Sequence, residues 1–144
     1  MFNTSQVECS GVVTYKSEIQ DNTSFNSTLR NFMAQEDFIC GSIQFREQTY
    51  VTGDLVVVGI EDCDDMDVGL IKAILVRASK VYFVIQRYRC KRMYLQFFVS
   101  ETPVNDVFEF IEVTKLIDYK PLILRGTINK FVYTLHHHVS HDYK

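Results

Sequence analysis

The chain has 144 residues, of which 47% are hydrophobic and 13% aromatic, and its formal net charge at pH 7 is −3. This apolar content is enough for one buried core without disulfide or metal staples, and it excludes a largely disordered chain. The charge is distributed unevenly along the chain. Residues 1–76 hold 12 acidic and 4 basic residues (net −8), whereas residues 77–144 hold 6 acidic and 11 basic residues (net +5). We expect the opposite charges to pair across the surface of one domain.

The first third of the chain predicts a strand followed by a polar insert. Residues 7–15 are rich in β-branched residues and predict a strand, whereas residues 16–37 are rich in Ser, Asn and Thr and predict a loop or insert. Three apolar residues of the insert have helical spacing, which indicates one short helix: Leu29, Phe32 and Met33. Ser24 or Asn26 is expected to cap that helix.

A regular series of strands begins at residue 38. Strands are predicted over 38–45, at Tyr50-Val51 and, after a Gly53-Asp54 turn, over 55–58 as a continuous apolar strand. The pattern then favours a hairpin, made of a strand over 68–76, a tight connection at 78–80 and a strand over 81–85. Gly69 inside the first of these strands indicates a bulge or a sharp bend.

The last third continues this alternation after a basic segment at residues 87–92. Strands are predicted over 94–99, over 107–113 after a turn at Glu101-Thr102-Pro103, over 122–124 and over 131–136. Residues 114–119 are expected to form one helical turn that ends before Pro121, because the residue before a proline avoids helical geometry. Residues 137–144 read as a flexible tail.

These elements predict a mostly β fold for the whole chain. About seven to eight short strands separated by regular turn signals suit a small barrel or sandwich, with one short helix in the N-terminal insert, and residues 1–144 are interpreted as a single β-rich domain.

Three segments carry a resemblance to a known family. Gly53-Asp54-Leu55-Val56-Val57-Val58, Gly69-Leu70-Ile71-Lys72-Ala73-Ile74 and Val81-Tyr82-Phe83-Val84 together are similar to SH3-like and bromo-adjacent-homology reader barrels. The segment Leu116–Leu122 with its closing strand resembles terminal modules of uncharacterised, transposon-associated animal proteins. The resemblance implies a chromatin-linked binding module without catalytic residues. Since the chain has no Trp, an aromatic cage would have to use Tyr and Phe.

The basic segment is the first candidate site. Basic residues beside aromatic rings are typical of single-stranded nucleic-acid grooves, where charge follows the phosphates and rings stack on bases. The candidate residues are Arg87, Tyr88, Arg89, Lys91, Arg92 and Tyr94. On a strand, Arg87, Arg89 and Lys91 would share one face. The alternative is a solvated hairpin tip, which the acidity of the whole chain favours.

Two further clusters could hold metal ions. His136, His138 and His141 could ligate zinc or a related ion, and the alternative is a solvated tail. The acidic run Glu61–Asp67 has the carboxylate density of a calcium loop, but its order does not match an EF-hand, so a solvated loop that pairs with basic residues is favoured.

Motifs of known enzymes are not found. The chain has no G-x-S-x-G elbow, phosphate-binding loop, G-x-G-x-x-G or H-E-x-x-H sequence, and it calls for no cofactor. The four cysteines have no metal-type spacing and are interpreted as free, inert thiols: Cys9, Cys40, Cys63 and Cys90.

The sequence therefore predicts a non-enzymatic protein-interaction module, a chromatin-linked adaptor or reader that binds a protein partner and self-associates through exposed strand edges. A nucleic-acid-binding OB-like barrel is the first alternative and an unrecognised hydrolase the second. The N-terminus lacks signal-peptide features and no apolar run approaches the length of a membrane helix. We thus expect an intracellular protein, nuclear or cytoplasmic, with no membrane partner.

Overall fold

The computed structural model describes residues 7–60, 65–93, 96–116, 118–126 and 131–134. In chain order the elements are β1 (Val7–Ser10), β2 (Thr14–Tyr15), the 3₁₀ turn η2 (Lys16–Glu18), α1 (Ser24–Phe32), β3 (Phe38–Cys40), β4 (Ser42–Phe45), β5 (Gln48–Val51), β6 (Leu55–Ile60), β7 (Asp65–Arg77), β8 (Lys80–Met93), β9 (Gln96–Glu112), the 3₁₀ turn η3 (Val113–Lys115), β10 (Asp118–Gly126) and β11 (Phe131–Thr134).

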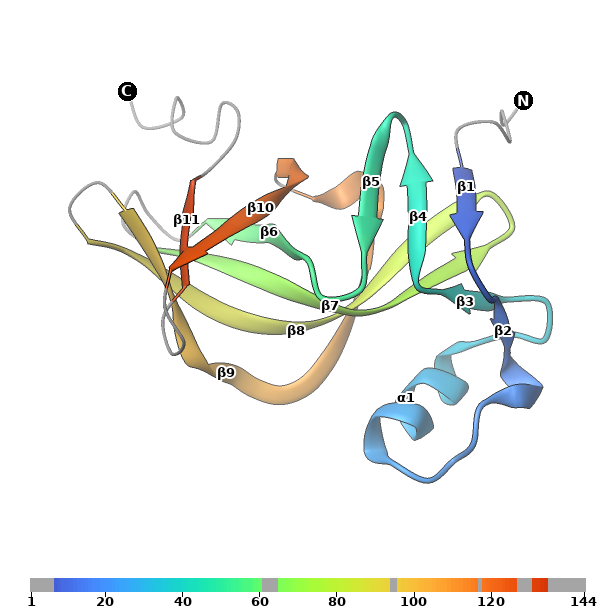
Figure 1. Cartoon of the computed structure of the whole chain (residues 1–144). Helices are drawn as coiled ribbons and strands as arrows, with labels where there is room; N and C mark the ends of the chain where they lie inside the picture. The colour runs from blue at the N-terminus through green and yellow to red at the C-terminus, as the bar shows by residue number, and fades with distance from the viewer. Residues whose placement is uncertain (1–6, 61–64, 94–95, 117, 127–130, 135–144) are drawn as a thin grey trace.

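The strands form two antiparallel sheets, which confirms the mostly β class. A three-stranded sheet has the order β1-β4-β5, and a larger sheet has the order β2-β3-β7-β6-β10-β11-β9-β8. Because β7 also pairs with β8, the ladders of the larger sheet run in a ring through β6, β7, β8, β9, β11 and β10. Figure 1 shows the long, curved strands β7, β8 and β9 below the upright sheet β1-β4-β5, with α1 on the far side of β3. This barrel-like arrangement agrees with the predicted small barrel or sandwich.

The central strands are longer than predicted. The predicted hairpin is confirmed, since Arg77 pairs with Lys80 across the tight connection, but β8 continues from Lys80 through the basic residues to Met93. The predicted turn at 101–103 is wrong, because these residues lie inside β9 and Pro103 pairs with Tyr88. Among the described residues, β11 pairs with the other edge of β9 only at residues 97–99, so no described strand lies beside Pro103 on that edge. Proline, which has no backbone N–H group to donate, is tolerated at such an edge position.

A bulge follows Pro103 in β9. Tyr88 pairs with Pro103 and Gln86 with Phe108, so four residues of β9 lie opposite the single residue Arg87. Val104 and Val107 at the two ends of this bulge are exposed by 45% and 64%. The strand predicted over 107–113 is present beyond the bulge, and its faces alternate: Phe108 and Phe110 pack against the apolar cluster that contains Leu29 of α1, whereas Ile111 packs against a different cluster.

The helix of the insert is confirmed, but its predicted cap is wrong. The side-chain oxygen of Thr23 accepts a hydrogen bond from the backbone amide of Asn26 at 3.0 Å, so Thr23 is the N-cap. Ser24 is the first helical residue. Leu29 and Met33 are buried, and Phe32 stacks on Phe110 with ring centroids 3.9 Å apart, which fixes the helix to β9.

Glycines lie at three departures from the predicted strands. The strand predicted over 7–15 bends at Gly11, which has a φ of +81°, and the strand predicted over 38–45 is divided at Gly41. The bulge predicted at Gly69 is wrong, because Gly69 pairs regularly with Val56 and Arg87. A Cβ at residue 69 would lie 2.5 Å from Cδ1 of Ile85, so glycine is needed there for close strand approach.

Among the described residues, three apolar clusters make up the core. The first joins residues of β3, β4 and β5 to residues of β6, β7 and β8. The second joins residues of β6, β7, β8 and β9, and the third joins α1 to β7 and β8. The predicted helical turn over 114–119 is shorter, at Val113–Lys115, and Val113 at its start is buried in the first cluster. Within the described residues, no helical segment has the length and apolar character needed to span a membrane.

Candidate functional site: a pocket beside a strained hairpin turn

The structure places the predicted basic residues in the middle of β8 and pairs two of them with carboxylates. Arg87 donates to Glu109 through Nε at 2.8 Å and Nη2 at 2.7 Å, and through Nη1 to Asp67 at 2.9 Å. Arg89 donates through Nε to the other oxygen of Asp67 at 2.7 Å. The hydrogen bond from Arg87 to Glu109 raises the pKa of this guanidinium, and the bond to Asp67 adds to the effect in spite of burial.

This pairing changes the interpretation of the basic segment. Two arginines facing two carboxylates across β7, β8 and β9 leave no local excess of positive charge, and the guanidinium groups are held by the sheet. Lys91, the third residue predicted to share a face with Arg87 and Arg89, is exposed and pairs in register with Asp65 of β7. Tyr88 is partly buried and packs against the second core cluster. The suggested hairpin tip is wrong for Arg87 and Arg89, which lie within a paired strand.

Several other candidates lie wholly or partly outside the described residues. The backbone of Arg92 belongs to β8, but its side chain, like Tyr94, is outside them, and so are His136, His138 and His141. Asp65 and Asp67 of the acidic run begin β7 instead of a loop, and Asp67 is nearly buried beside Arg87 and Arg89. No group of metal-ligating side chains occurs within the part of the chain that is described.

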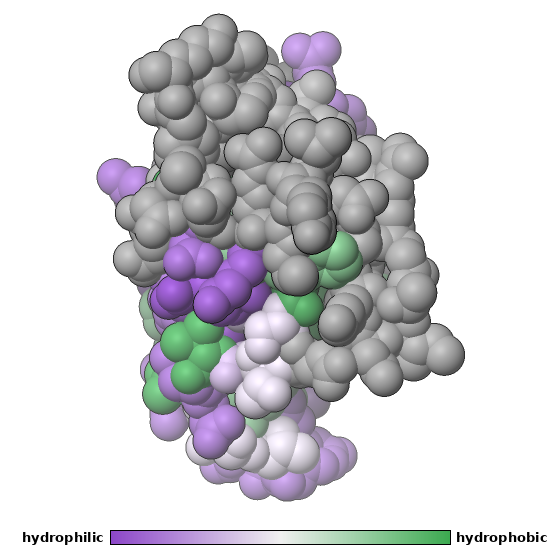
Figure 2. All heavy atoms as spheres, turned by 90° about the vertical axis from the view of Figure 1, so that its left-hand side faces the viewer, coloured by the Kyte–Doolittle hydropathy of each residue, from purple (hydrophilic) through white to green (hydrophobic). Residues whose placement is uncertain are grey.

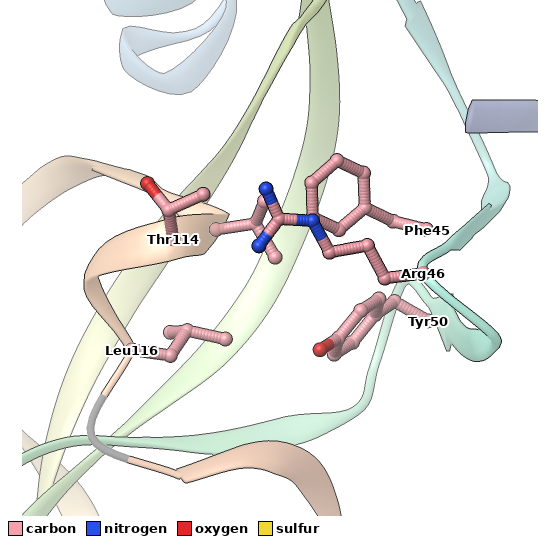
Figure 3. A pocket seen from close by; sticks show the side chains of 6 residues that line it. Phe45, Arg46, Tyr50, Thr114 and Leu116 are labelled. Carbon is pink, nitrogen blue, oxygen red and sulfur yellow. The ribbon is translucent and has the colours of Figure 1, made fainter. Parts of the chain in front are cut away.

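A pocket of about 320 Å³ lies between the β4–β5 turn and η3. It is lined by Phe45, Arg46, Tyr50, Val113, Thr114 and Leu116. Figure 3 shows the guanidinium of Arg46 reaching from the hairpin across the pocket toward Thr114, above Tyr50 and Leu116. The lining therefore combines aromatic and aliphatic side chains with two polar groups, the Arg46 guanidinium and the Thr114 hydroxyl.

Local geometry explains how the hairpin places this arginine. Phe45 pairs with Gln48, so the β4–β5 connection has two residues, Arg46 and Glu47. Their φ angles are +51° and +68°, which corresponds to the left-handed conformation that a type I′ hairpin turn demands of both central residues. Asn and Gly normally fill these positions, and other residues cost of order 1 kcal/mol or more each. The turn therefore stores strain where Arg46 meets the pocket.

Neighbouring contacts fix the pocket walls. Tyr50 is 1% exposed, and its ring packs edge-on against Phe83 at a centroid distance of 4.8 Å. Arg46 lies over the ring of Phe45 at 4.9 Å, and it forms no ion pair with any carboxylate in the described ranges. The hydroxyl of Thr114 donates to Glu112 at 3.0 Å. The arrangement offers a firm apolar floor and a cation that can meet an anionic group.

Figure 2 looks onto the end where β11 and the adjoining ends of β8 and β9 lie, and its described residues are hydrophilic side chains beside a small hydrophobic group.

Sequence reasoning did not find the pocket. The two residues between Phe45 and Gln48 are a possible signal, because a two-residue gap between β-rich segments is typical of a tight hairpin. Neither Arg46 nor Glu47 is a usual turn residue, however, and η3 joins the pocket from a place about 70 positions later in the chain, counted from the element bounds.

No family model matches the chain, and neither the curated proteins nor the solved structures include one with detectable similarity to it. The resemblance to SH3-like and bromo-adjacent-homology barrels stays a prediction. The function must therefore be argued from the pocket and its surroundings.

Proposed function

We propose that the protein is a non-enzymatic protein-interaction module whose pocket between the β4–β5 turn and η3 receives an apolar side chain of a partner segment. A carboxylate of that segment, from an acidic side chain or a chain terminus, would pair with Arg46. The observation that carries the proposal is the strained turn that holds Arg46 over an apolar pocket.

Physical chemistry supports this occupant. A volume of about 320 Å³ is at the lower end of ligand pockets, which suits one side chain better than a cofactor. A guanidinium presents parallel N–H groups that match a carboxylate in a bidentate pair. Backbone strain at a binding position is a recurring means of holding a contact group ready.

The same charge argues against one kind of reader. A cage for methylated lysine uses electron-rich ring faces to attract a cation, whereas here Arg46 already lies over the ring of Phe45. Repulsion between two cations would oppose a methyl-lysine side chain in this pocket. A chromatin link and self-association remain predictions that this pocket does not carry.

The experiment begins with a displayed library of random peptides that end in free carboxylates, selected on the purified chain. Selected peptides are then titrated against the wild type and against Arg46→Ala, Arg46→Lys and Lys80→Ala. Lys80 is an exposed cation at the start of β8, directly after the β7–β8 turn, and serves as the matched charge control.

We expect Arg46→Ala to weaken binding about tenfold or more, since a lost charge-assisted pair is worth roughly 1.5–3 kcal/mol. Arg46→Lys should recover only part of the affinity because lysine lacks the fork, and Lys80→Ala should bind as the wild type does. Equal binding by the wild type and Arg46→Ala would refute the proposed site.

A further inference from the structure

Cys9 and Cys40 are 31 positions apart in the chain but come together where the two sheets meet. Cys9 lies on β1, which pairs only with β4 among the described strands, and Cys9 is exposed. Cys40 ends β3 and is 6% exposed. Figure 1 shows the lower end of β1 next to the junction at which β3 passes into β4.

Strand register brings the two side chains to the same side. Cys9 pairs directly with Ile43 on β4, and directly paired residues of an antiparallel ladder project on the same face. Ile43 and Cys40 belong to one buried cluster. The Cys9 side chain therefore points toward the part of the core that contains Cys40.

Electrostatics agrees with this placement. Burial, together with the negative charge and hydrogen bonding of the neighbouring Cys9, raises the pKa of the Cys40 thiol to about 12. A hollow of about 220 Å³ beside Cys40, also lined by Val12 and Gly41, leaves room for the thiol to move.

We propose that Cys9 and Cys40 form a reversible disulfide that fastens the edge strand β1 to β3. Peroxide is the oxidant. The exposed Cys9 thiolate attacks hydrogen peroxide, an S–O bond forms as the O–O bond breaks, and hydroxide leaves, so Cys9 becomes a sulfenic acid. The Cys40 thiol then loses its proton and attacks the Cys9 sulfur, the S–S bond forms, and the sulfenic oxygen leaves as water. In total, two thiols are oxidised and one peroxide is reduced to two waters.

The order of these steps follows from the surroundings of the two sulfurs. The thiolate is the reactive form, and Cys40 is both buried and held protonated, so the first attack belongs to Cys9. Once Cys9 is a neutral sulfenic acid, its negative charge no longer opposes ionisation of Cys40. Burial still slows the second step.

The disulfide would close a segment that contains β2, α1 and β3. Closing a loop of about 30 residues lowers the entropy of the unfolded chain and so raises the melting temperature. For a domain of this size we expect a rise of roughly 5–10 °C on oxidation.

The test uses the full chain, reduced and then treated with a small excess of hydrogen peroxide. Intact mass measures the loss of two hydrogens, digestion without reductant locates the bond, and thermal unfolding measures the shift. The variants are Cys9→Ser, at an exposed position that tolerates the change, and Cys90→Ala as a control for another thiol.

We expect the wild type and Cys90→Ala to form the Cys9–Cys40 bond, with the rise in melting temperature, and to lose both on reduction. Cys9→Ser should show neither. The proposal would be overturned if oxidised wild type left Cys40 unbonded, if Cys9 bonded to Cys63 or to a second chain, or if Cys9→Ser showed the same thermal shift.

Discussion

The ion pair between Asp37 and Arg77 is the contact whose removal should affect stability most clearly. Asp37 is fully buried, and its Oδ2 accepts hydrogen bonds from the amide of Ala34 at 2.8 Å and from Nε and Nη2 of Arg77 at 2.9 and 2.7 Å. Arg77 also donates to the carbonyl of Phe32 at 2.8 Å and lies over the Phe32 ring at 4.5 Å. The pair therefore joins the end of α1 to β7.

The expected cost of Asp37→Asn follows from this geometry. The amide keeps the shape of the side chain but removes the charge that faces Arg77. Breaking a buried pair costs about 3–5 kcal/mol, and since the Arg77 side chain is 34% exposed, water compensates part of this loss. We expect a loss of about 2–3 kcal/mol in the free energy of unfolding, or roughly 6–12 °C in melting temperature.

The pH dependence provides an independent check. Burial raises the pKa of Asp37, but the hydrogen bonds from Arg77 and Ala34 and the charge of Arg77 outweigh it, so the pKa lies below its ordinary value of 3.8. A carboxyl with a lowered pKa contributes stability above the unfolded value and loses it as the pH falls through the folded value. The difference between wild type and Asp37→Asn should be full near pH 7 and should shrink below about pH 4.

The assay is urea unfolding of the wild type, Asp37→Asn, Arg77→Met and the double variant. We expect a coupling of at least about 1 kcal/mol between the two positions, since residues in direct contact are not additive. Additive losses, or a variant difference that persists unchanged at acid pH, would refute the role given to this pair.

Four further substitutions test other parts of the fold. Gly69→Ala should lower the free energy of unfolding, measured in urea, by about 1–3 kcal/mol, because the new Cβ would lie 2.5 Å from Ile85. Gly41→Ala is the control and should be nearly neutral, because nothing lies within 4 Å of its new Cβ. Equal effects of the two substitutions would contradict the argument from close approach. Glu47→Gly should raise the free energy of unfolding by about 1 kcal/mol, because it removes the strain of a left-handed non-glycine residue. In urea the midpoint should rise while the slope of free energy against urea concentration stays the same. A loss of stability would contradict this. Arg87→Met should lower the free energy of unfolding by about 1–2 kcal/mol because it leaves two carboxylates facing only Arg89, and a neutral result would mean that the network contributes nothing measurable.

Much of the fold could be predicted because its strands carry local signals. The apolar run over 55–58 and the hairpin of β7 and β8 follow from β-branched residues and a tight polar connection, and both are confirmed. The helix at Ser24–Phe32 follows from the spacing of its apolar residues. These features depend on neighbours in sequence.

The structure departs from the prediction where residues distant in sequence determine the local conformation. Charged residues at 87–91 looked like the end of a strand, but Asp67 and Glu109 from the adjacent strands neutralise Arg87 and allow β8 to continue. Gly69 looked like a bulge, but it is required by Ile85 of another strand. The pocket and the Cys9–Cys40 approach likewise join residues that no local pattern connects.

The central claim, that the protein binds a partner segment beside Arg46, is tested most directly by nuclear magnetic resonance. A selected peptide is titrated into the ¹⁵N-labelled chain, and a short single-stranded oligonucleotide is titrated into a second sample at low salt. We predict that the peptide shifts amide signals of residues 45–50 and 113–116 and that Arg46→Ala needs about tenfold or more peptide to reach the same shifts. Peptide shifts elsewhere, or shifts along 87–91 with the oligonucleotide and none with the peptide, would contradict the account.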